Sequence, residues 1–150
     1  MSSPIVLRTK KLHPSAQLPR YAHTGPWGDL AADLYSVAAA TLAPGQTTPV
    51  PTGIALEFPS DYGALVEDRS GLAVRGITTL AGVIDPGYRG EIKVILTNLN
   101  PHPVELAAGD RIAQLRLVQR LTAIFEEILD PEEALAEAPR GAAGFGSTGA

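Results

Sequence analysis

The chain has 150 residues, the length of one ordinary domain, and its 45% hydrophobic and 19% charged residues are typical of a globular protein. It has no cysteine, which excludes disulfides, thiolate zinc sites and a cysteine nucleophile. The formal net charge is −4 and the excess acid clusters near the C-terminus, so we expect no broad basic face for duplex nucleic acid.

The first third of the chain predicts short strands separated by turns. Residues 4–12 predict a strand, and the Pro- and Gly-rich residues 13–29 predict a loop. Residues 30–42 are rich in alanine, which suits a helix, but they also contain a short apolar segment between polar residues that suits a bent strand, and we favour the strand. Residues 44–45 (Pro-Gly) signal a turn, and residues 47–58, which carry two prolines, predict an edge-like strand.

Two strands around a short loop form the clearest pattern of the chain. Residues 77–84 and 91–98 flank residues 85–90, which predicts a hairpin. The Pro-Gly pair in that loop suits a type II turn, in which Gly87 takes a positive φ. Apolar and other residues alternate along 91–98, which predicts a half-buried strand.

The remaining segments complete a β-rich pattern. Residues 99–110 predict a turn, residues 111–119 and 121–129 predict strands, and residues 131–138 suit a helical turn or a solvated linker. Residues 140–150 contain four glycines and cannot form a packed core. Short strands separated by turn signals every 8–12 residues or so predict an all-β sandwich or barrel.

Two loops carry residues that suit ligand binding. The loop at 85–90 is most simply a structural turn, but it could also present Asp85 and Tyr88 to a ligand, with free backbone groups beside it that read a planar base edge. Arg69, Ser70 and Gly71 combine a forked cation, a hydroxyl and a closely approaching backbone, which suits phosphate oxygens, although most such tripeptides are surface loops.

Two further segments can also be interpreted either as ordinary structure or as part of a ligand-binding site. Gln114 is a polar residue in an otherwise apolar part of its strand and needs partners, which a ligand could supply. Residues 140–149 have the Gly, Ser and Thr of a phosphate-binding loop without its lysine, and a Gly-rich terminus is ordinarily a disordered tail. Phe145 is unusual in such a tail and suits stacking on a base.

In this order and spacing, these segments resemble the five motifs of the trimeric deoxyuridine triphosphate nucleotidohydrolases (dUTPases). The segments similar to motifs one to five are residues 31–36, 68–73, 82–98, 109–117 and 140–149. The resemblance implies a jelly-roll-like β-barrel homotrimer with active sites shared between subunits. It implies a catalytic domain over residues 1–138 and a flexible C-terminal arm, residues 139–150, that closes over a site. It also implies Mg²⁺-dependent hydrolysis of dUTP to dUMP and pyrophosphate, which limits uracil in DNA and supplies dUMP for dTMP synthesis.

The resemblance assigns the chemistry to a few residues. Asp85 would activate the water that attacks the α-phosphorus, and Asp33 would touch a water bound to a Mg²⁺ that the substrate phosphates mainly hold. The residues expected to hold phosphate oxygens are Arg69, Ser70, Gly71, Gln114 and Arg140, with Gly146, Ser147 and Thr148 added by the arm. Backbone around Val83, Ile84 and Lys93 would pair with the uracil edge, Tyr88 would pack under the sugar, and Phe145 would stack on the uracil when the arm closes.

The chain departs from the family pattern at four places. They are Ala31 and Ala32 before the motif-one acid, Asp68 where proline is usual, Gly87 where aspartate is frequent, and Thr79 where bacterial members often have asparagine. Thr79 stands at a position that contributes to uracil binding in that pattern. None of these departures removes a proposed catalytic group.

Two other functions compete with dUTP hydrolysis. A dCTP deaminase, or a bifunctional enzyme of the same fold, would need a glutamate base on the strand after the turn, where this chain has Ile95. A non-catalytic trimeric nucleotide-binding module would not need Asp85. No apolar run approaches the ~20 residues that span a bilayer, and the N-terminus lacks the order of a signal peptide, so we expect a cytoplasmic protein without membrane or nucleic-acid partners.

Overall fold

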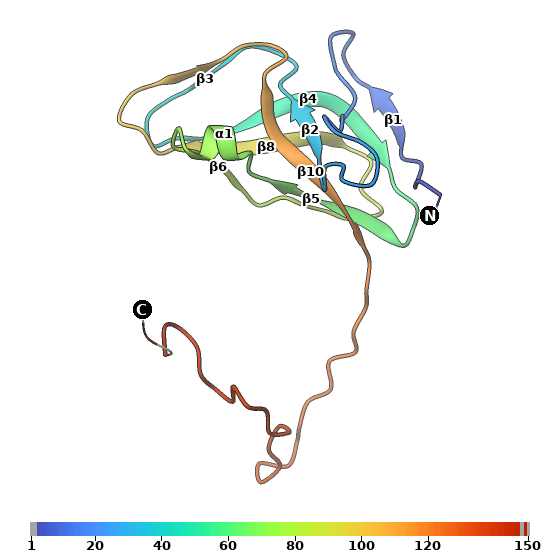
Figure 1. The fold of residues 1–150 in the computed structure, drawn as a ribbon, viewed down its shortest axis with the longest axis vertical. Helices are drawn as coiled ribbons and strands as arrows, with labels where there is room; N and C mark the ends of the chain where they lie inside the picture. The colour runs from blue at the N-terminus through green and yellow to red at the C-terminus, as the bar shows by residue number, and fades with distance from the viewer. Residues whose placement is uncertain (1–2, 148, 150) are drawn as a thin grey trace.

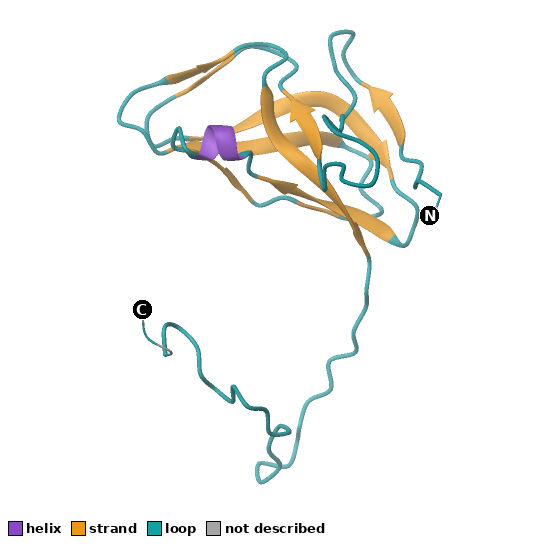
Figure 2. Ribbon diagram, in the orientation of Figure 1, coloured by secondary structure: helices purple, strands orange, loops and turns teal. Residues whose placement is uncertain are grey.

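The computed structural model describes residues 3–147 and 149 and is almost entirely β (Figures 1 and 2). Its described part contains ten strands and one short helix, α1 (Ser70–Ala73). The strands are β1 (Arg8–Lys11), β2 (Ala32–Tyr35), β3 (Ala40–Leu42), β4 (Thr47–Glu57), β5 (Tyr62–Glu67), β6 (Ile77–Leu80), β7 (Val83–Ile84), β8 (Glu91–Asn98), β9 (Val104–Leu106) and β10 (Arg111–Gln119).

Two antiparallel four-stranded sheets enclose one core, which confirms the all-β prediction. The first sheet has the strand order β1-β4-β8-β6, the second β2-β10-β5-β7, and β3 pairs with β9 separately. Along β8 the predicted alternation is present, because Ile92, Val94 and Leu96 are buried while the residues between them are not. They meet Leu34 and Ile112 of the second sheet in a single apolar cluster. The core therefore fixes the two sheets face to face.

The expected edge strand over residues 47–58 is an edge along only half of its length. Residues 47–51 of β4 pair with β8, whereas β1 pairs with residues 54–57 at the other end of the strand. Pro49 and Pro51 lie in the half that β1 does not cover. Proline has no N–H to donate, and on this open side of β4 no strand is present that would need one.

The predicted strand over residues 77–84 is wrong as a single element. The chain crosses from one sheet to the other at Ala81 and Gly82, which have φ values of 62° and 132°. β6 before the crossing pairs with β8, and β7 after it pairs with β5. Besides β4, the antiparallel partner of β8 is thus β6, and the connection between β6 and β8 is longer than the predicted 85–90 loop.

The turn inside that connection is also not of type II. The Tyr88 N–H donates to the Asp85 carbonyl oxygen at 3.1 Å, which closes a four-residue turn. Gly87 is not among the residues with positive φ, although a type II turn requires one at that position. Proline at the second turn position is equally compatible with type I geometry, so the Pro-Gly pair did not decide the turn type.

The C-terminal segment differs most from expectation. The sheets end at Gln119, and the predicted strand over 121–129 is absent because no strand of the described chain lies beside it. Leu121, Ile124 and Phe125 are 86%, 95% and 95% exposed. The segment leaves the sheets in an extended path (Figure 1), and residues 131–138 contain a turn and no helix.

Other expectations agree with the structure or differ in extent. The strand interpretation of residues 30–42 is confirmed by β2 and β3, and the turn at Pro44 and Gly45 is present. The first strand is shorter than predicted and begins at Arg8. In the part of the chain that the structure describes, no helix is long and apolar enough to cross a membrane.

Candidate functional site

Most of the predicted site residues before the C-terminal segment line one of two separate cavities. The first, which we call the turn cavity, has a volume of about 280 Å³ and is lined by Pro49, Val83, Ile84, Asp85, Tyr88, Glu91, Lys93 and Ile95. The second, which we call the arginine cavity, has a volume of about 320 Å³ and is lined by Ala22, His23, Asp29, Leu30, Ala31, Asp33, Arg69, Ser70, Arg111 and Gln114.

The turn cavity lies where the two sheets separate. β7 is the outer strand of its sheet, and β6 covers only residues 95–98 of β8. Between β7 and the start of β8, each strand therefore has one edge that no other strand of the described chain pairs with. On β7 the backbone groups of successive residues point to opposite sides, so those of Val83 face this free edge, whereas those of Ile84 face β5. Lys93 lies on the part of β8 that β6 does not cover.

Tyr88 and Asp85 are held by the turn itself. The Tyr88 hydroxyl donates to the Glu91 carbonyl oxygen at 2.8 Å, and Arg89 Nη1 donates to the Pro86 carbonyl oxygen at 2.6 Å. Asp85 is exposed, and within the described chain its carboxylate has no hydrogen-bond partner. A carboxylate left free at the mouth of a cavity is able to accept a proton from a bound water.

Three neighbouring strands build the arginine cavity. β10 lies between β2 and β5, and its Gln114 stands opposite Asp33 on one side and Glu67 on the other. Arg69 lies two residues after the end of β5 and donates from Nε to Asp33 Oδ1 at 2.8 Å, while Arg111 Nη1 lies 3.6 Å from Asp33 Oδ2. Gln114 Nε2 donates to the Asp68 carbonyl oxygen at 2.7 Å. Two arginines and two carboxylates, Asp33 and Asp29, therefore line the cavity, and the guanidinium groups of the arginines are the ones suited to an anionic ligand.

Sequence reasoning missed His23, Asp29, Arg111 and Glu91. His23 Nδ1 lies 3.0 Å from Asp29 Oδ1, and the His23 N–H donates to Asp29 Oδ2 at 2.7 Å. These hydrogen bonds hold the pKa of the Asp29 carboxyl below its ordinary value. The two residues lie in a loop without periodicity, so no sequence pattern indicated that they meet at the wall of the arginine cavity.

The two cavities lie at opposite ends of β5 in one chain. Ile84 pairs with Ala64 near the start of β5, so the adjacent Asp85 belongs to that end, whereas Arg69 comes after Glu67 at the other end. Six residues of extended chain span about 16 Å. One chain therefore does not bring Asp85 and Arg69 to the same ligand atom.

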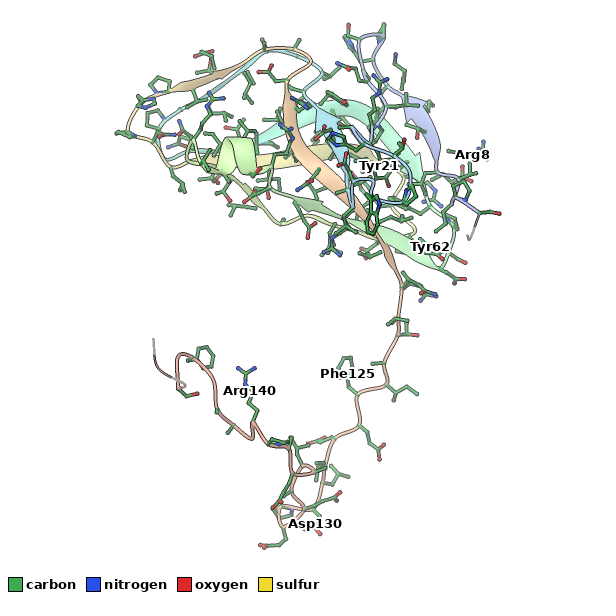
Figure 3. All side chains as sticks on the ribbon, in the orientation of Figure 1. Arg8, Tyr21, Tyr62, Phe125, Asp130 and Arg140 are labelled. Carbon is green, nitrogen blue, oxygen red and sulfur yellow. The ribbon has the colours of Figure 1, made fainter. Side chains whose placement is uncertain are left out.

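The other predicted residues lie outside both cavities. Thr79 is on β6, and its N–H donates to the Asp68 carboxylate. Arg140, Phe145, Gly146 and Ser147 are exposed on the C-terminal segment, as the labelled Arg140 in Figure 3 illustrates. Thr148 lies outside the described residues. Gly71 is in α1, where open space surrounds it.

The described residues contain no group of three or more His, Asp or Glu side chains that could hold a metal ion. Asp33 is the carboxylate that was predicted to touch a metal-bound water, and Arg69 and Arg111 both form ion pairs with it. This donor set fits a magnesium ion that keeps its waters and is held mainly by the phosphates of a ligand, not by a protein cage.

Comparisons with known proteins agree with the geometry. The family model described as dUTPase matches residues 21–149. A deoxyuridine 5′-triphosphate nucleotidohydrolase from Thermobifida fusca is 48% identical over 144 residues, which cover 93% of this chain and 76% of that protein. The protein of that name from Solibacter usitatus is 46% identical over 146 residues and 95% of each chain.

Solved structures share the fold. A mutant dUTPase of Staphylococcus bacteriophage 80alpha with dUpNHpp has a TM-score of 0.84 and 24% identity, over 97% of this chain and 99% of that chain. A mutant dUTPase of phage phi11 of S. aureus, described with a structural Mg(II) ion, has a TM-score of 0.76 and 21% identity, over 85% and 99%. The resemblance seen in the motifs is confirmed by the family match and the identity of these relatives: the chain belongs to the dUTPase family.

Proposed function

We propose that the protein hydrolyses dUTP to dUMP and pyrophosphate with Mg²⁺, in a homotrimer whose active sites combine the turn cavity of one subunit with the arginine cavity of another. The observation that carries this proposal is the division of the predicted site into two complementary halves. One half has backbone edges and an aromatic ring for a nucleoside, and the other has cations for phosphates. A second copy of the chain would bring the two halves together.

Uracil is read by the free backbone edges of β7 and β8. The donor and acceptor pattern of these edges matches the carbonyl and N3–H groups of uracil, whereas cytosine has an amino donor in place of one carbonyl. Tyr88, fixed by its bond to the Glu91 carbonyl, packs under the deoxyribose. The tight turn over residues 85–88 would leave no room for the methyl group of thymine.

The hydrolytic step uses Asp85. Its carboxylate accepts a proton from a water molecule whose oxygen attacks the α-phosphorus in line. Pyrophosphate then leaves with the electrons of the broken P–O bond. When bound with the triphosphate, magnesium would neutralise part of its negative charge, and Asp33 would touch one of the metal-bound waters.

Phosphate oxygens are held by the second subunit. Arg69, Gln114 and the hydroxyl of Ser70 point donors at them, and the N–H groups of Ser70 and Gly71 are not used by the backbone bonds of α1. From the arm, residues 139–150, Arg140, Gly146, Ser147 and Thr148 add donors and Phe145 stacks on the uracil. We retain the cytoplasm as the expected compartment.

A pyrophosphate-release assay with dUTP, dTTP, dCTP and UTP, each with and without Mg²⁺, tests this function. We expect turnover of dUTP alone and only with the metal. Asp85→Asn should still bind dUTP but lose about 10²- to 10⁴-fold in kcat. Ammonia release from dCTP would instead support the deaminase. The alkyl side chain of Ile95, which lines the turn cavity, argues against that activity because it cannot act as a base. Nucleotide binding without any turnover would support a non-catalytic module.

A further inference from the structure

Two titratable side chains of the arginine cavity take no part in the function proposed above. His23 and Asp29 line this cavity together with Asp33 on β2, Arg69 after β5 and Arg111 on β10. With the histidine neutral, the two carboxylates balance the two guanidinium groups, and these five side chains carry no net charge. A triphosphate keeps a negative charge even with one magnesium ion bound, and it is attracted more strongly by a lining of net positive charge. A proton on His23 would supply that charge.

The loop over residues 23–29 holds His23 at the cavity wall. The Asp29 N–H donates to the His23 carbonyl oxygen at 3.0 Å, and the His23 N–H donates to Asp29 Oδ2 at 2.7 Å, so the two ends of the loop are tied together. Inside the loop, the Gly28 N–H donates to the Gly25 carbonyl oxygen at 3.0 Å. The His23 side chain is 79% exposed, so a ligand in the cavity can reach it.

Asp29 also fixes the direction of the imidazole ring. His23 Nδ1 lies 3.0 Å from Asp29 Oδ1, and the hydrogen bonds from the His23 N–H and ring hold the pKa of the Asp29 carboxyl below its ordinary value. An ionised carboxylate only accepts hydrogen bonds, so Nδ1 is the donor and carries a hydrogen. The other ring nitrogen, Nε2, forms no hydrogen bond among the described residues. In the neutral ring Nε2 is an acceptor, and it becomes a donor only when a second proton binds.

We propose that His23 takes up a proton from solvent when the triphosphate binds, and that its Nε2–H then donates a hydrogen bond to a phosphate oxygen. The inference rests on the proposed function, which puts the phosphates beside Arg69 and Gln114 in the same cavity. Phosphate oxygens are acceptors, so a neutral ring repels them with its lone pair, whereas an imidazolium ring forms a charge-assisted hydrogen bond. The proton moves from water to the ring, and no bond of the nucleotide forms or breaks. Histidine suits this role because its charge ordinarily changes between about pH 5 and 8.

Proton uptake at His23 makes nucleotide binding depend on pH. Because the bound protein holds more protons than the free protein, the affinity should rise as the pH falls. The probe is the α,β-imido analogue of dUTP with Mg²⁺, which binds without being cleaved. Between pH 8 and pH 6, its Kd should fall about 3- to 10-fold more in wild type than in His23→Gln. The phosphates of the analogue titrate equally with both proteins, so the difference between them reports the histidine.

Isothermal titration calorimetry measures the proton itself. In buffers that differ in ionisation enthalpy, wild type at pH 7 should take up about half a proton per site more than His23→Gln. Glutamine does not titrate but keeps an amide donor for Asp29, so this variant separates the charge of the ring from its role in closing the loop. The matched control is His102→Gln, because His102 is exposed and its Nδ1 lies 3.3 Å from the Pro103 carbonyl oxygen, and it should take up as many protons as wild type.

The outcomes are distinguishable. Equal proton uptake in wild type and His23→Gln, when wild type binds the analogue, overturns the inference, and so does an equal loss of uptake in His102→Gln. If His23→Gln does not fold by circular dichroism, NMR of the histidine rings decides, since the chain has three histidines. The ring signal that persists in both His13→Gln and His102→Gln should titrate at a higher pH when the analogue and Mg²⁺ are bound, and an unchanged titration counts against the inference. Failure of wild type to bind the analogue or to hydrolyse dUTP would contradict the proposed function instead.

Discussion

Asp68 ties the end of β5 to β6. Its Oδ2 accepts from the Thr78 hydroxyl at 2.9 Å, and its Oδ1 accepts from the Thr79 N–H. Burial by itself raises the pKa of Asp68, but the hydrogen bonds from Thr79 and Thr78 outweigh it and hold the pKa below its ordinary value of 3.8. Asp68, which stands where proline is usual in the family, thus directs its negative charge toward β6.

Replacing Asp68 should destabilise the fold. Asp68→Ala leaves the Thr79 N–H without its acceptor, so we expect a loss of about 1–3 kcal/mol in the free energy of unfolding. The measurement is urea unfolding at pH 7 and at one fixed protein concentration. Wild-type behaviour in the variant would show that these bonds contribute nothing net.

The same carboxylate should make stability depend on acid. A group with a lowered pKa in the folded state stabilises it above its unfolded pKa, and this stability is lost as pH falls through the folded pKa. Below about pH 4, wild type should therefore lose stability more steeply than Asp68→Asn. Parallel curves for the two proteins would exclude Asp68 as a contributor.

At the level of elements, the crossing at Ala81 and Gly82 positions the turn cavity. It sends β7 to one sheet and leaves the start of β8 in the other, which opens the gap between their edges. Gly82 adopts a left-handed φ, and a Cβ there would collide with the Val66 carbonyl oxygen. The Gly82 carbonyl in turn accepts from the Val66 N–H at 2.8 Å. Only glycine can adopt this φ and also leave room for the Val66 carbonyl oxygen.

Gly82→Ala should consequently lower the stability by about 1–3 kcal/mol. The matched control is Gly87→Ala, because Gly87 lies in the neighbouring turn with open space around it and no positive φ. Thermal unfolding of both variants checks the prediction: a large decrease in Tm is expected for the first and a small change for the second. Equal decreases in Tm for the two variants would mean that a side chain at position 82 does not strain the crossing.

At the scale of the whole molecule, the exposed apolar side chains after Gln119 and the two half-sites lead to the same conclusion. Leu121, Ile124 and Phe125 have no partner surface among the described residues, and Phe125 stands free of the sheets in Figure 3. Contiguous exposed apolar side chains typically mark an interface. Both features fit a subunit that is complete only beside another copy of itself.

Mixed trimers test the sharing of sites. Asp85→Asn and Arg69→Ala should each be nearly inactive alone, since each destroys one half of every site. After unfolding and refolding together in equal amounts, about a quarter of the sites should combine two intact halves and recover activity. Separately refolded variants mixed afterwards are the control. No recovery in the co-refolded sample would place the whole site within one chain.

Much of this architecture was predictable because it is local. The alternation along 91–98 places Ile92, Val94 and Leu96 in the core, and the Pro-Gly pair at 44–45 forms its turn. Arg69, Gln114 and Asp85 could be identified as candidates because they are polar or charged residues that interrupt the alternation of apolar residues. The short motifs around them, read in order, indicated the family that the comparisons confirm.

The sequence by itself determined the strand character, the turns and the identity of the chemical groups, since each depends on side-chain period or on residue type within a few positions. Only the tertiary structure decided how residues 77–84 divide between two sheets, that the site separates into two cavities, and that Glu91 Oε2 is buried without a hydrogen-bond partner among the described residues. These features depend on pairing between strands far apart in the chain, and that pairing is set by the common core and not by any local pattern.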